Sequence, residues 1–332
     1  MQVSLIEDKG EWNGYAEGFG AHPLQMWQWG ELKEQTGPWT PYRLAVRDDA
    51  GTAVGGAQVL VRKMPFPFGA IAYAPRGPFA ADGRLMDVAD AAADWCRANT
   101  KSQSLKIDPA VVELTWSEGW EKSETSLINK TACLSLDPDE DEIMKAIPNR
   151  KCRQYIRKGE RDGVVVRPAE ERDLDAVLAL YHQTADADGF AIHADEFYRA
   201  AFTALDGIQQ FFVAEMDGEI QAFLWNVTSK GGTTFELWGA VNDAGKRDRA
   251  NYYMKWVAIT EAKKAGAKLY DLNGLLNDGI SDFKLLFVPE PAYWVETHDK
   301  PLRGLYRPMN KALAYNRERN EKHNAQKDTS RD

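Results

Sequence analysis

The chain has 332 residues, 44% of them hydrophobic and 27% charged, and a formal net charge of −9. This length and apolar content fit two domains, or two lobes of one large fold. The negative charge excludes a protein that binds nucleic acid over its whole surface, so contact with RNA would need a local basic patch.

The cysteines and the first residues indicate the compartment. Cys96, Cys133 and Cys152 are scattered without a CxxC pair, which argues against a disulfide framework or a zinc site. The chain begins with acidic residues, and it has no run of about 18 apolar residues. We therefore expect a cytoplasmic protein without a signal peptide or transmembrane helix. A membrane-bound substrate would be met by peripheral contact.

The first half of the chain predicts a defined order of elements. A helical segment at 25–35 precedes a hairpin at 42–61, which turns at Asp48–Gly51. A short strand at 70–73 follows. Then comes a helix with Leu85, Val88, Ala92 and Trp95 on one face, and a strand at 104–108.

The second half predicts the same order again. Asp173 opens a helix, and a helical segment at 195–204 precedes a hairpin at 211–224 that turns at Asp217-Gly218. A strand at 234–238, a helix carrying Tyr252, Trp256 and Ile259, and a strand at 268–272 follow. Two copies of one mixed fold are the simplest explanation.

This order of elements resembles tandem GNAT-like (acyl-CoA N-acyltransferase-like) domains, of class α/β (α+β). We expect a first domain at 1–165, a second at 166–315, and a flexible charged tail at 316–332. The Gly-rich loop that binds acyl-CoA before a helix is missing in both copies, which leaves room for another activated donor.

Four stretches resemble the FemABX-like family of tRNA-dependent peptidoglycan bridge aminoacyltransferases (peptidyltransferases). They occur in the family's order, at 25–33, 73–78, 149–164, and 266–274 with 279–287. The resemblance implies transfer of Ala, Ser or Gly from aminoacyl-tRNA to the side-chain amine of the stem-peptide Lys or Orn, or to a growing bridge. It assigns the precursor to the first domain and the aminoacyl-tRNA to the second.

The segment Phe283-Lys-Leu-Leu-Phe287 matches the family's Phe-Lys pair, which lies where the aminoacylated tRNA end binds. The resemblance makes Lys284 a catalytic residue, and Phe283 and Phe287 tRNA contacts. A lysine ammonium in partly apolar surroundings could meet a phosphate or an oxyanion. The alternative is a solvated lysine at the start of an amphipathic helix.

The resemblance also places the precursor's diphosphate on Lys33. Its partner in the family is an arginine in an Arg-x-x-x-Tyr pattern. Here the stretch reads Phe190-Ala-Ile-His193-Ala-Asp-Glu-Phe197-Tyr198, so His193 replaces the arginine, and Tyr198 is a further candidate for substrate binding. A neutral histidine cannot clamp a phosphate bidentately. The substitution puts UDP-linked recognition in doubt and leaves open a UDP-linked or lipid-linked muropeptide.

Four more residues are site candidates. Asp108 matches a residue considered as the family's general base, although an aspartate before proline is also a common turn residue. Tyr73 and Arg76, in Tyr-Ala-Pro-Arg-Gly-Pro, suit oriented substrate binding, and a structural salt bridge is the alternative for Arg76. Trp238 ends a strand beside the expected peptide channel, with core packing as its alternative.

The densest basic run predicts the contact with tRNA phosphates. Arg150, Lys151, Arg153 and Arg157 lie on one predicted helix, where three of them share a face. A solvated helix face is the alternative. Lys246, Arg247 and Arg249 form a second, weaker candidate, and no heptad pattern predicts the coiled-coil arm of some family members.

The expected chemistry needs no cofactor. An ester donor and an amine acceptor require positioning, proton removal and oxyanion stabilisation, and no motif for a metal or a covalent nucleophile is present. Two other functions stay open, namely a CoA-dependent N-acyltransferase and a non-catalytic protein that binds RNA or precursor. Nothing in the sequence demands more than a monomer.

Overall fold

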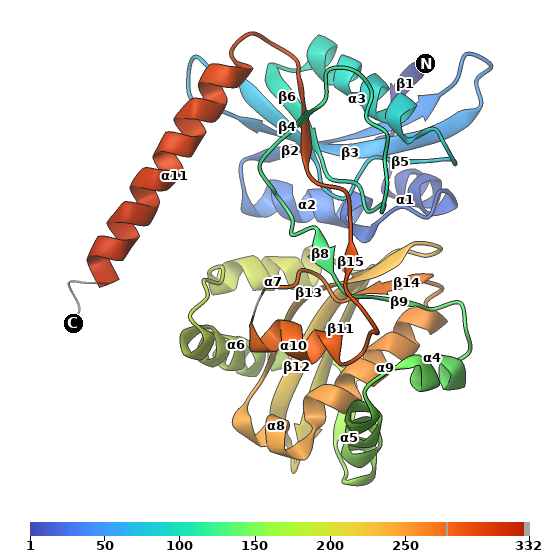
Figure 1. The fold of residues 1–332 in the computed structure, drawn as a ribbon, viewed down its shortest axis with the longest axis vertical. Coiled ribbons are helices and arrows are strands. Elements are labelled where there is room, and N and C mark those ends of the chain that lie inside the picture. Colours follow the sequence, from blue (N-terminus) through green and yellow to red (C-terminus); the bar gives the residue numbers. More distant parts are fainter. Residues whose placement is uncertain (277, 329–332) are drawn as a thin grey trace.

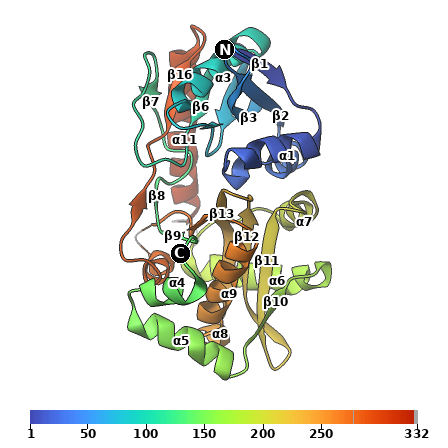
Figure 2. The same ribbon diagram turned by 90° about the vertical axis from the view of Figure 1, so that its right-hand side faces the viewer.

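The computed structural model describes residues 1–276 and 278–328. Two mixed sheets lie one above the other along the long axis, each flanked by helices (Figure 1). Figure 2 shows that α4 and α5 lie on the opposite side of the second sheet from α6 and α7. This is the tandem GNAT-like α/β architecture expected from the sequence.

The first sheet has the order β1-β2-β3-β4-β6-β16-β7, with β5 paired to β3. Its strands are β1 (Gln2–Leu5), β2 (Trp39–Arg47), β3 (Ala53–Lys63), β4 (Ala70–Ala74), β5 (Phe79–Ala80), β6 (Ser102–Ile107), β7 (Glu121–Lys122) and β16 (His298–Pro301). Its helices are α1 (Lys9–Gly18), the 3-10 helix η1 (Pro23–Gln25), α2 (Trp27–Thr36), α3 (Leu85–Asn99) and α11 (Tyr306–Asp328).

The second sheet has the order β10-β11-β12-β13-β14-β9. Its strands are β9 (Cys133–Ser135), β10 (Val165–Pro168), β11 (Gln209–Met216), β12 (Glu219–Thr228), β13 (Thr233–Val241) and β14 (Leu269–Asp271). Its helices are α4 (Glu140–Ala146), α5 (Arg150–Arg161), η2 (Glu171–Asp173), α6 (Leu174–Asp188), α7 (Asp195–Ala204), α8 (Asp243–Asp248), α9 (Ala250–Lys264) and α10 (Gly279–Leu285). A small ribbon joins β8 (Lys130–Thr131) to β15 (Ala292–Tyr293).

The predicted repeat is present strand by strand. Antiparallel β2–β3 and parallel β4–β6 recur as antiparallel β11–β12 and parallel β13–β14. The β11–β12 turn follows from its sequence, because Asp217 and Gly218 both adopt the positive φ (54° and 83°) that a two-residue hairpin turn needs.

The division between the domains differs from the expected 165/166 boundary. Residues 132–164 already belong to the second core, where Ile143, Cys152 and Ile156 pack with α9 residues such as Met254 and Ala258. Later, the chain returns to the first sheet through β16. The apolar face of α5 causes the difference, since it is buried only against the second domain.

The expected flexible tail is helical as far as the structure describes it. Residues 316–328 continue helix α11, which runs alongside the molecule (Figure 1), and 329–332 lie outside the described residues. The segment contains no glycine or proline and is rich in helix formers, which explains the helix.

One continuous core joins the two domains. Leu24 and Met26 of the first domain belong to the same buried cluster as Val227 and Phe235 of the second. The Ser229 hydroxyl also donates to the Ala21 carbonyl at 2.5 Å. Each fully buried leucine or methionine contributes about 1.5–3 kcal/mol, so the junction is a packed interface rather than a hinge.

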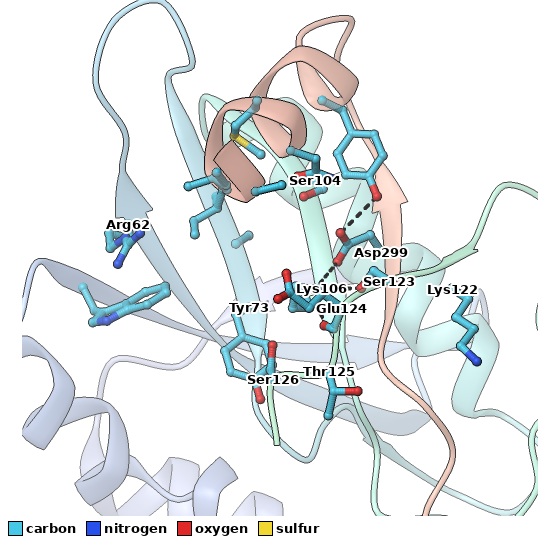
Figure 3. Close-up of a pocket in the computed structure, with 18 residues that line it drawn as sticks. Arg62, Tyr73, Ser104, Lys106, Lys122, Ser123, Glu124, Thr125, Ser126 and Asp299 are labelled. Carbon is cyan, nitrogen blue, oxygen red and sulfur yellow. Dashed lines mark hydrogen bonds and ion pairs between the residues drawn. The ribbon is translucent and has the colours of Figure 1, made fainter. Parts of the chain in front are cut away.

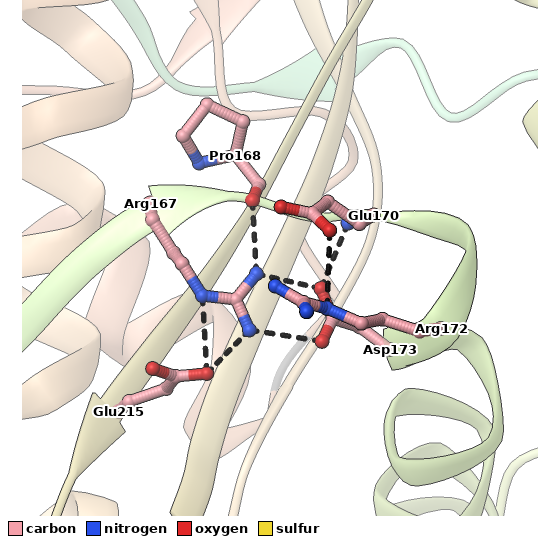
Figure 4. A network of polar contacts seen from close by, with 6 residues as sticks. All are labelled: Arg167, Pro168, Glu170, Arg172, Asp173 and Glu215. Atoms are coloured by element: carbon pink, nitrogen blue, oxygen red, sulfur yellow. Dashed lines mark hydrogen bonds and ion pairs between the residues drawn. The ribbon is translucent and has the colours of Figure 1, made fainter. Parts of the chain in front are cut away.

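A charged network fixes the edge strand β10 of the second sheet (Figure 4). Arg167 makes a bidentate pair with Asp173 at 2.6 and 2.9 Å and also contacts Glu215 at 2.5 Å. Its hydrogen bonds hold the pKa of Asp173 below the ordinary value. The network thus ties β10, β11 and the start of α6 together.

Candidate functional site

The site forms where the two parallel strand pairs end. Pairing stops at Ala74–Ile107 in the first domain and at Phe235–Asp271 in the second. Ligands in α/β sheets commonly bind at the carboxyl ends of strands. Arg76 follows β4, and its Nη2 donates to the carbonyl of Ile128, which packs against Gly274 just after β14, so the two ends meet at the domain junction.

Asp108 lies at this junction, fully enclosed. Its Oδ2 accepts from the Tyr73 hydroxyl at 2.7 Å, and its Oδ1 accepts from the Arg76 backbone N–H at 2.8 Å. Burial raises the pKa of Asp108, and the Arg76 charge opposes that effect. With 1% of its surface exposed, Asp108 has no face open to a substrate amine in this state.

Arg76 is also enclosed, in a left-handed backbone conformation (φ 52°). Its Nη2 donates to the Ile128 carbonyl at 2.7 Å, while Nε and Nη1 have no partner among the described residues. Ile128 packs against Gly274, where a Cβ would come within 2.8 Å of it. The chain of contacts thus passes from Asp108 into the second domain.

Lys284 completes this chain of contacts. Its Nζ donates to the carbonyls of Asn273 at 3.3 Å and Gly274 at 3.2 Å. Burial lowers the pKa of Lys284, and the nearby Glu236 carboxylate opposes that effect. An ammonium has three N–H donors, so one remains for a ligand.

A cleft of about 290 Å³ opens beside Lys284. It exists because β14 ends at Asp271, whereas β13 continues unpaired on that side from Glu236 to Val241. Apolar side chains and three lysines surround it. The lining residues are Phe223, Leu224, Glu236, Gly239, Ala240, Val241, Lys246, Asn251, Met254, Lys255, Gly279, Ile280, Phe283 and Lys284.

The sequence did not predict the buried polar groups in and next to this cleft. Glu236 forms an ion pair with Lys255, and the Tyr270 hydroxyl donates to the same Glu236 oxygen at 2.9 Å. Asp271 accepts from Thr131 at 2.5 Å and from Trp294 at 3.0 Å. The sequence held two signals for these groups. Glu236 lies inside an apolar strand, and Lys255 lies inside an apolar stretch of helix.

The expected precursor residues form a second cluster across the domains. Lys33 of α2 lies over the rings of Trp29 at 4.5 Å and Phe197 at 5.3 Å, and His193 stacks on Phe197 at 4.0 Å. Burial lowers the pKa of Lys33. Burial and the Lys33 charge lower the pKa of His193, which is therefore neutral at pH 7.

Tyr198 and Trp238 support this cluster. Their rings lie 5.2 Å apart, and the Tyr198 hydroxyl accepts from the His193 backbone N–H at 3.1 Å. Tyr198 is 2% exposed, so it orients the loop of His193 rather than presenting a free surface. Trp238 is half-buried and keeps a face near the cluster.

The basic helix α5 lies beside the cleft's second wall, α9. Arg150, Lys151 and Arg157 are exposed, and Arg153 is half-buried and donates to the Ile147 carbonyl. Arg249 stacks over the Tyr155 ring at 4.1 Å, which joins α5 to the α8–α9 segment. Lys246 of that segment lines the cleft, so the α8–α9 segment that contacts α5 also brings a cation to the cleft.

One predicted tRNA contact is wrong. Phe287 has no exposed surface and packs 5.4 Å from Phe283 and 6.4 Å from Tyr252 in the second core. The helix turn after Lys284 carries it inward. Phe283 is half-buried and lines the cleft, so Phe287 supports it from behind.

A larger cavity, of about 690 Å³, lies on the first sheet beneath α11 (Figure 3). Trp39, Arg62, Tyr73 and Lys122 line it. Lys106 lies inside and pairs with Asp299 at 3.2 Å. Because Tyr73 also donates to Asp108, this cavity adjoins the junction.

The described part of the chain lacks two structural features. No group of three or more His, Cys, Asp or Glu side chains is placed to hold a metal ion there. None of the described helices is both long and apolar enough to cross a membrane.

Comparison with known proteins identifies the fold. Residues 149–285 match the family model described as an acetyltransferase (GNAT) domain. The crystal structure of FemX superposes with a TM-score of 0.81 at 19% identity, covering 94% of this chain and 100% of that chain. No curated protein matches the sequence.

Two more distant structures share the architecture. A conserved protein of unknown function from Bacteroides thetaiotaomicron has a TM-score of 0.60 at 11% identity, covering 90% of this chain and 99% of that one. The structure of L-PGS from Bacillus licheniformis has a TM-score of 0.51 at 12% identity, covering 95% of this chain and 98% of that one. The chain therefore has the fold of FemX, with two tandem GNAT-like domains, and the segment that matches the GNAT domain model forms most of the second.

Proposed function

We propose that the protein is an aminoacyltransferase of peptidoglycan bridge synthesis. It would move Ala, Ser or Gly from aminoacyl-tRNA to the side-chain amine of the stem-peptide Lys or Orn, or to a growing bridge. The observation that carries this proposal is the half-buried Lys284 ammonium. It lies at the open end of β13–β14, with one N–H donor left for a ligand.

The second domain would hold the donor. The cations from α5 to Lys246 suit the phosphates of the tRNA end, and the cleft beside Phe283 suits its aminoacylated terminus. The cleft's apolar wall suits a small side chain. The tRNA is a co-substrate, and we propose no cofactor.

The first domain would hold the acceptor. Lys33 would contact the diphosphate of a UDP-linked or lipid-linked muropeptide, while the neutral His193 adds a hydrogen bond but no charge. A lipid-linked acceptor would bring the protein into peripheral contact with a membrane. We infer that one chain suffices, because both domains contribute to one junction.

In the reaction, the acceptor amine attacks the ester carbonyl. A carbon–nitrogen bond forms, the carbon–oxygen bond to the ribose breaks, and the proton lost by the amine balances the one gained by the ribose hydroxyl. Lys284 would stabilise the oxyanion. Asp108 would act by holding Tyr73 and Arg76 in place, and direct proton removal by it would require the junction to open.

A CoA-dependent N-acyltransferase is the second candidate, favoured by the match to an acetyltransferase domain. The segment before α9 argues against it. That segment forms the short helix α8, in which a Cβ on Gly245 would lie 2.8 Å from the Gln221 carbonyl oxygen. A Gly-rich loop with free N–H groups for a pyrophosphate is therefore not formed there.

The test is transfer of labelled Ala, Ser or Gly from charged tRNA, with UDP-muropeptide and lipid-linked precursor offered separately. Lys284→Ala should reduce transfer about 100- to 1000-fold. Lys264→Ala, an exposed lysine of the same domain, is the matched control and should transfer normally. Absence of transfer to both acceptors, together with acetyl transfer from acetyl-CoA, would replace the proposal with the second candidate.

A further inference from the structure

Glu236 lines the cleft, and only one of its two carboxylate oxygens has a partner among the described residues. Glu236 is 5% exposed, and its two contacts, from Lys255 and from the Tyr270 hydroxyl, are both made to Oε1. Its Oε2 makes no hydrogen bond to any described residue. Oε2 is not sealed from solvent, so it is an acceptor that the cleft leaves open to a ligand.

The other groups of the cleft limit what this ligand can be. Glu236 is the only carboxylate among the described lining residues, and Lys284 lines the same cleft, where the Glu236 charge opposes the lowering of the Lys284 pKa by burial. Lys284 turns two of its donors to the Asn273 and Gly274 carbonyls. The cleft therefore offers an acceptor at Glu236, a donor at Lys284, and an apolar wall that includes Leu224 and Met254.

We propose that Oε2 of Glu236 is the binding site for the α-ammonium group of the aminoacyl donor. This inference rests on the proposed function and specifies its donor. The ester carbonyl then faces Lys284, and the amino-acid side chain packs on the apolar wall. An acetyl or other acyl group without an amine leaves Oε2 unpaired and binds more weakly.

Lys255 has the role of a resident counter-ion. Its ammonium, 5% exposed, neutralises Glu236 when the cleft is empty, because an unpaired buried carboxylate would be strongly disfavoured. Tyr270 fixes the carboxylate from the other side, with its hydroxyl supported by Asn226 at 3.1 Å. Glu236 is thus held with one oxygen directed away from both partners.

The test compares two stable donor analogues that differ only in the amine. One is 3′-alanylamino-3′-deoxyadenosine, and the other is 3′-propionylamino-3′-deoxyadenosine. Binding to the full chain is measured by calorimetry. The wild-type protein should bind the alanyl compound about 10- to 100-fold more tightly. Glu236→Gln should bring this ratio close to one and leave the affinity for the propionyl compound almost unchanged.

The matched control is Glu261→Gln on α9, which removes an exposed glutamate of the same domain and should keep the wild-type ratio. The wild-type ratio can be measured even if Glu236→Gln does not fold. Equal affinities in the wild-type protein would overturn the amine site while leaving the tRNA-dependent function intact. If neither analogue binds and charged tRNA supports no transfer, the inference and the proposed function fail together.

Discussion

The two domains use the same strand pair in different ways. In the first, β4 and β6 end together at Ala74 and Ile107, and β16 covers the outer side of β6. In the second, β14 has three residues, and β13 continues beyond it to Val241. The outer strand is covered in both pairs, by β16 and by β9, but only in the second does β13 run on unpaired and line a cleft.

Both pairs nevertheless finish in a buried aspartate. Asp108 follows β6, and Asp271 ends β14; burial raises the pKa of each, and the Arg76 charge opposes the shift in both cases. The comparison teaches that both copies of the repeat carry a buried carboxylate at the junction, while only in the second does a strand run on unpaired to line a cleft that contains Lys284. We therefore assign the donor to the second domain.

The largest expected effect tests the equivalence of the two aspartates. Asp271→Ala leaves donors of Thr131, Trp294 and Asn273 unpaired, so the free energy of unfolding should fall by about 3–5 kcal/mol. Asp108→Ala should cost a similar amount, because the Tyr73 hydroxyl and the Arg76 N–H lose their acceptor. Urea denaturation measures both.

The exposed Asp186 on α6 supplies the control, since its replacement by alanine should change nothing measurable. If replacing either buried aspartate changes the free energy of unfolding as little as Asp186→Ala does, the two aspartates are not structural equivalents. The comparison between the domains would then lose its basis.

A smaller effect concerns the edge strand of the second sheet. Arg167→Ala removes the network that joins β10 to β11 and α6, and should lower the free energy of unfolding by about 1–3 kcal/mol at pH 7. The hydrogen bonds from Arg167 lower the pKa of Asp173. Their stabilisation is therefore present above the unfolded pKa of about 4 and is lost as the pH falls through the folded value.

Denaturation of both proteins between pH 7 and pH 2 checks this prediction. The difference between wild type and Arg167→Ala should stay constant down to about pH 4 and shrink below it. If the difference in the free energy of unfolding grew below pH 4, the stabilising partner of Arg167 would not be Asp173.

The smallest effect is expected at the matching edge of the first sheet. There the N-terminal ammonium group of Met1 contacts Asp49 at 3.1 Å, but the Asp49 side chain is 94% exposed. Exposed pairs contribute little. Asp49→Ala should leave the midpoint temperature of thermal unfolding unchanged. A clear drop in that temperature would show that this ion pair stabilises β1, as the Arg167 network stabilises β10.

Much of the fold could be predicted because its signals are local. Alternating apolar residues and the Asp-Gly turn define the hairpins, and the repeat follows from their order. Lys33, His193 and Tyr198 were expected at one site and do meet there, across two domains. Lys284 was also expected, and the structure adds the carbonyls that hold it.

The remaining features depend on long-range packing. The crossing of residues 132–164 into the second domain depends on which core receives the apolar face of α5. The cleft depends on where β14 stops, which no local pattern determines. Glu236 and Lys255 lie inside apolar segments, and only their pairing in space shows that they share a site. Phe287 was predicted at the surface but lies in the core, because residues one helix turn apart can face opposite sides.

The most direct test of the central claim is where a donor binds. Hydrogen–deuterium exchange of the full chain, with and without 3′-alanylamino-3′-deoxyadenosine, would locate it. We predict slower exchange in peptides that cover β13 and α10, with no change beneath α11. Protection confined to the first domain, around Tyr73 and Lys106, would contradict the assignment of the donor to the open cleft.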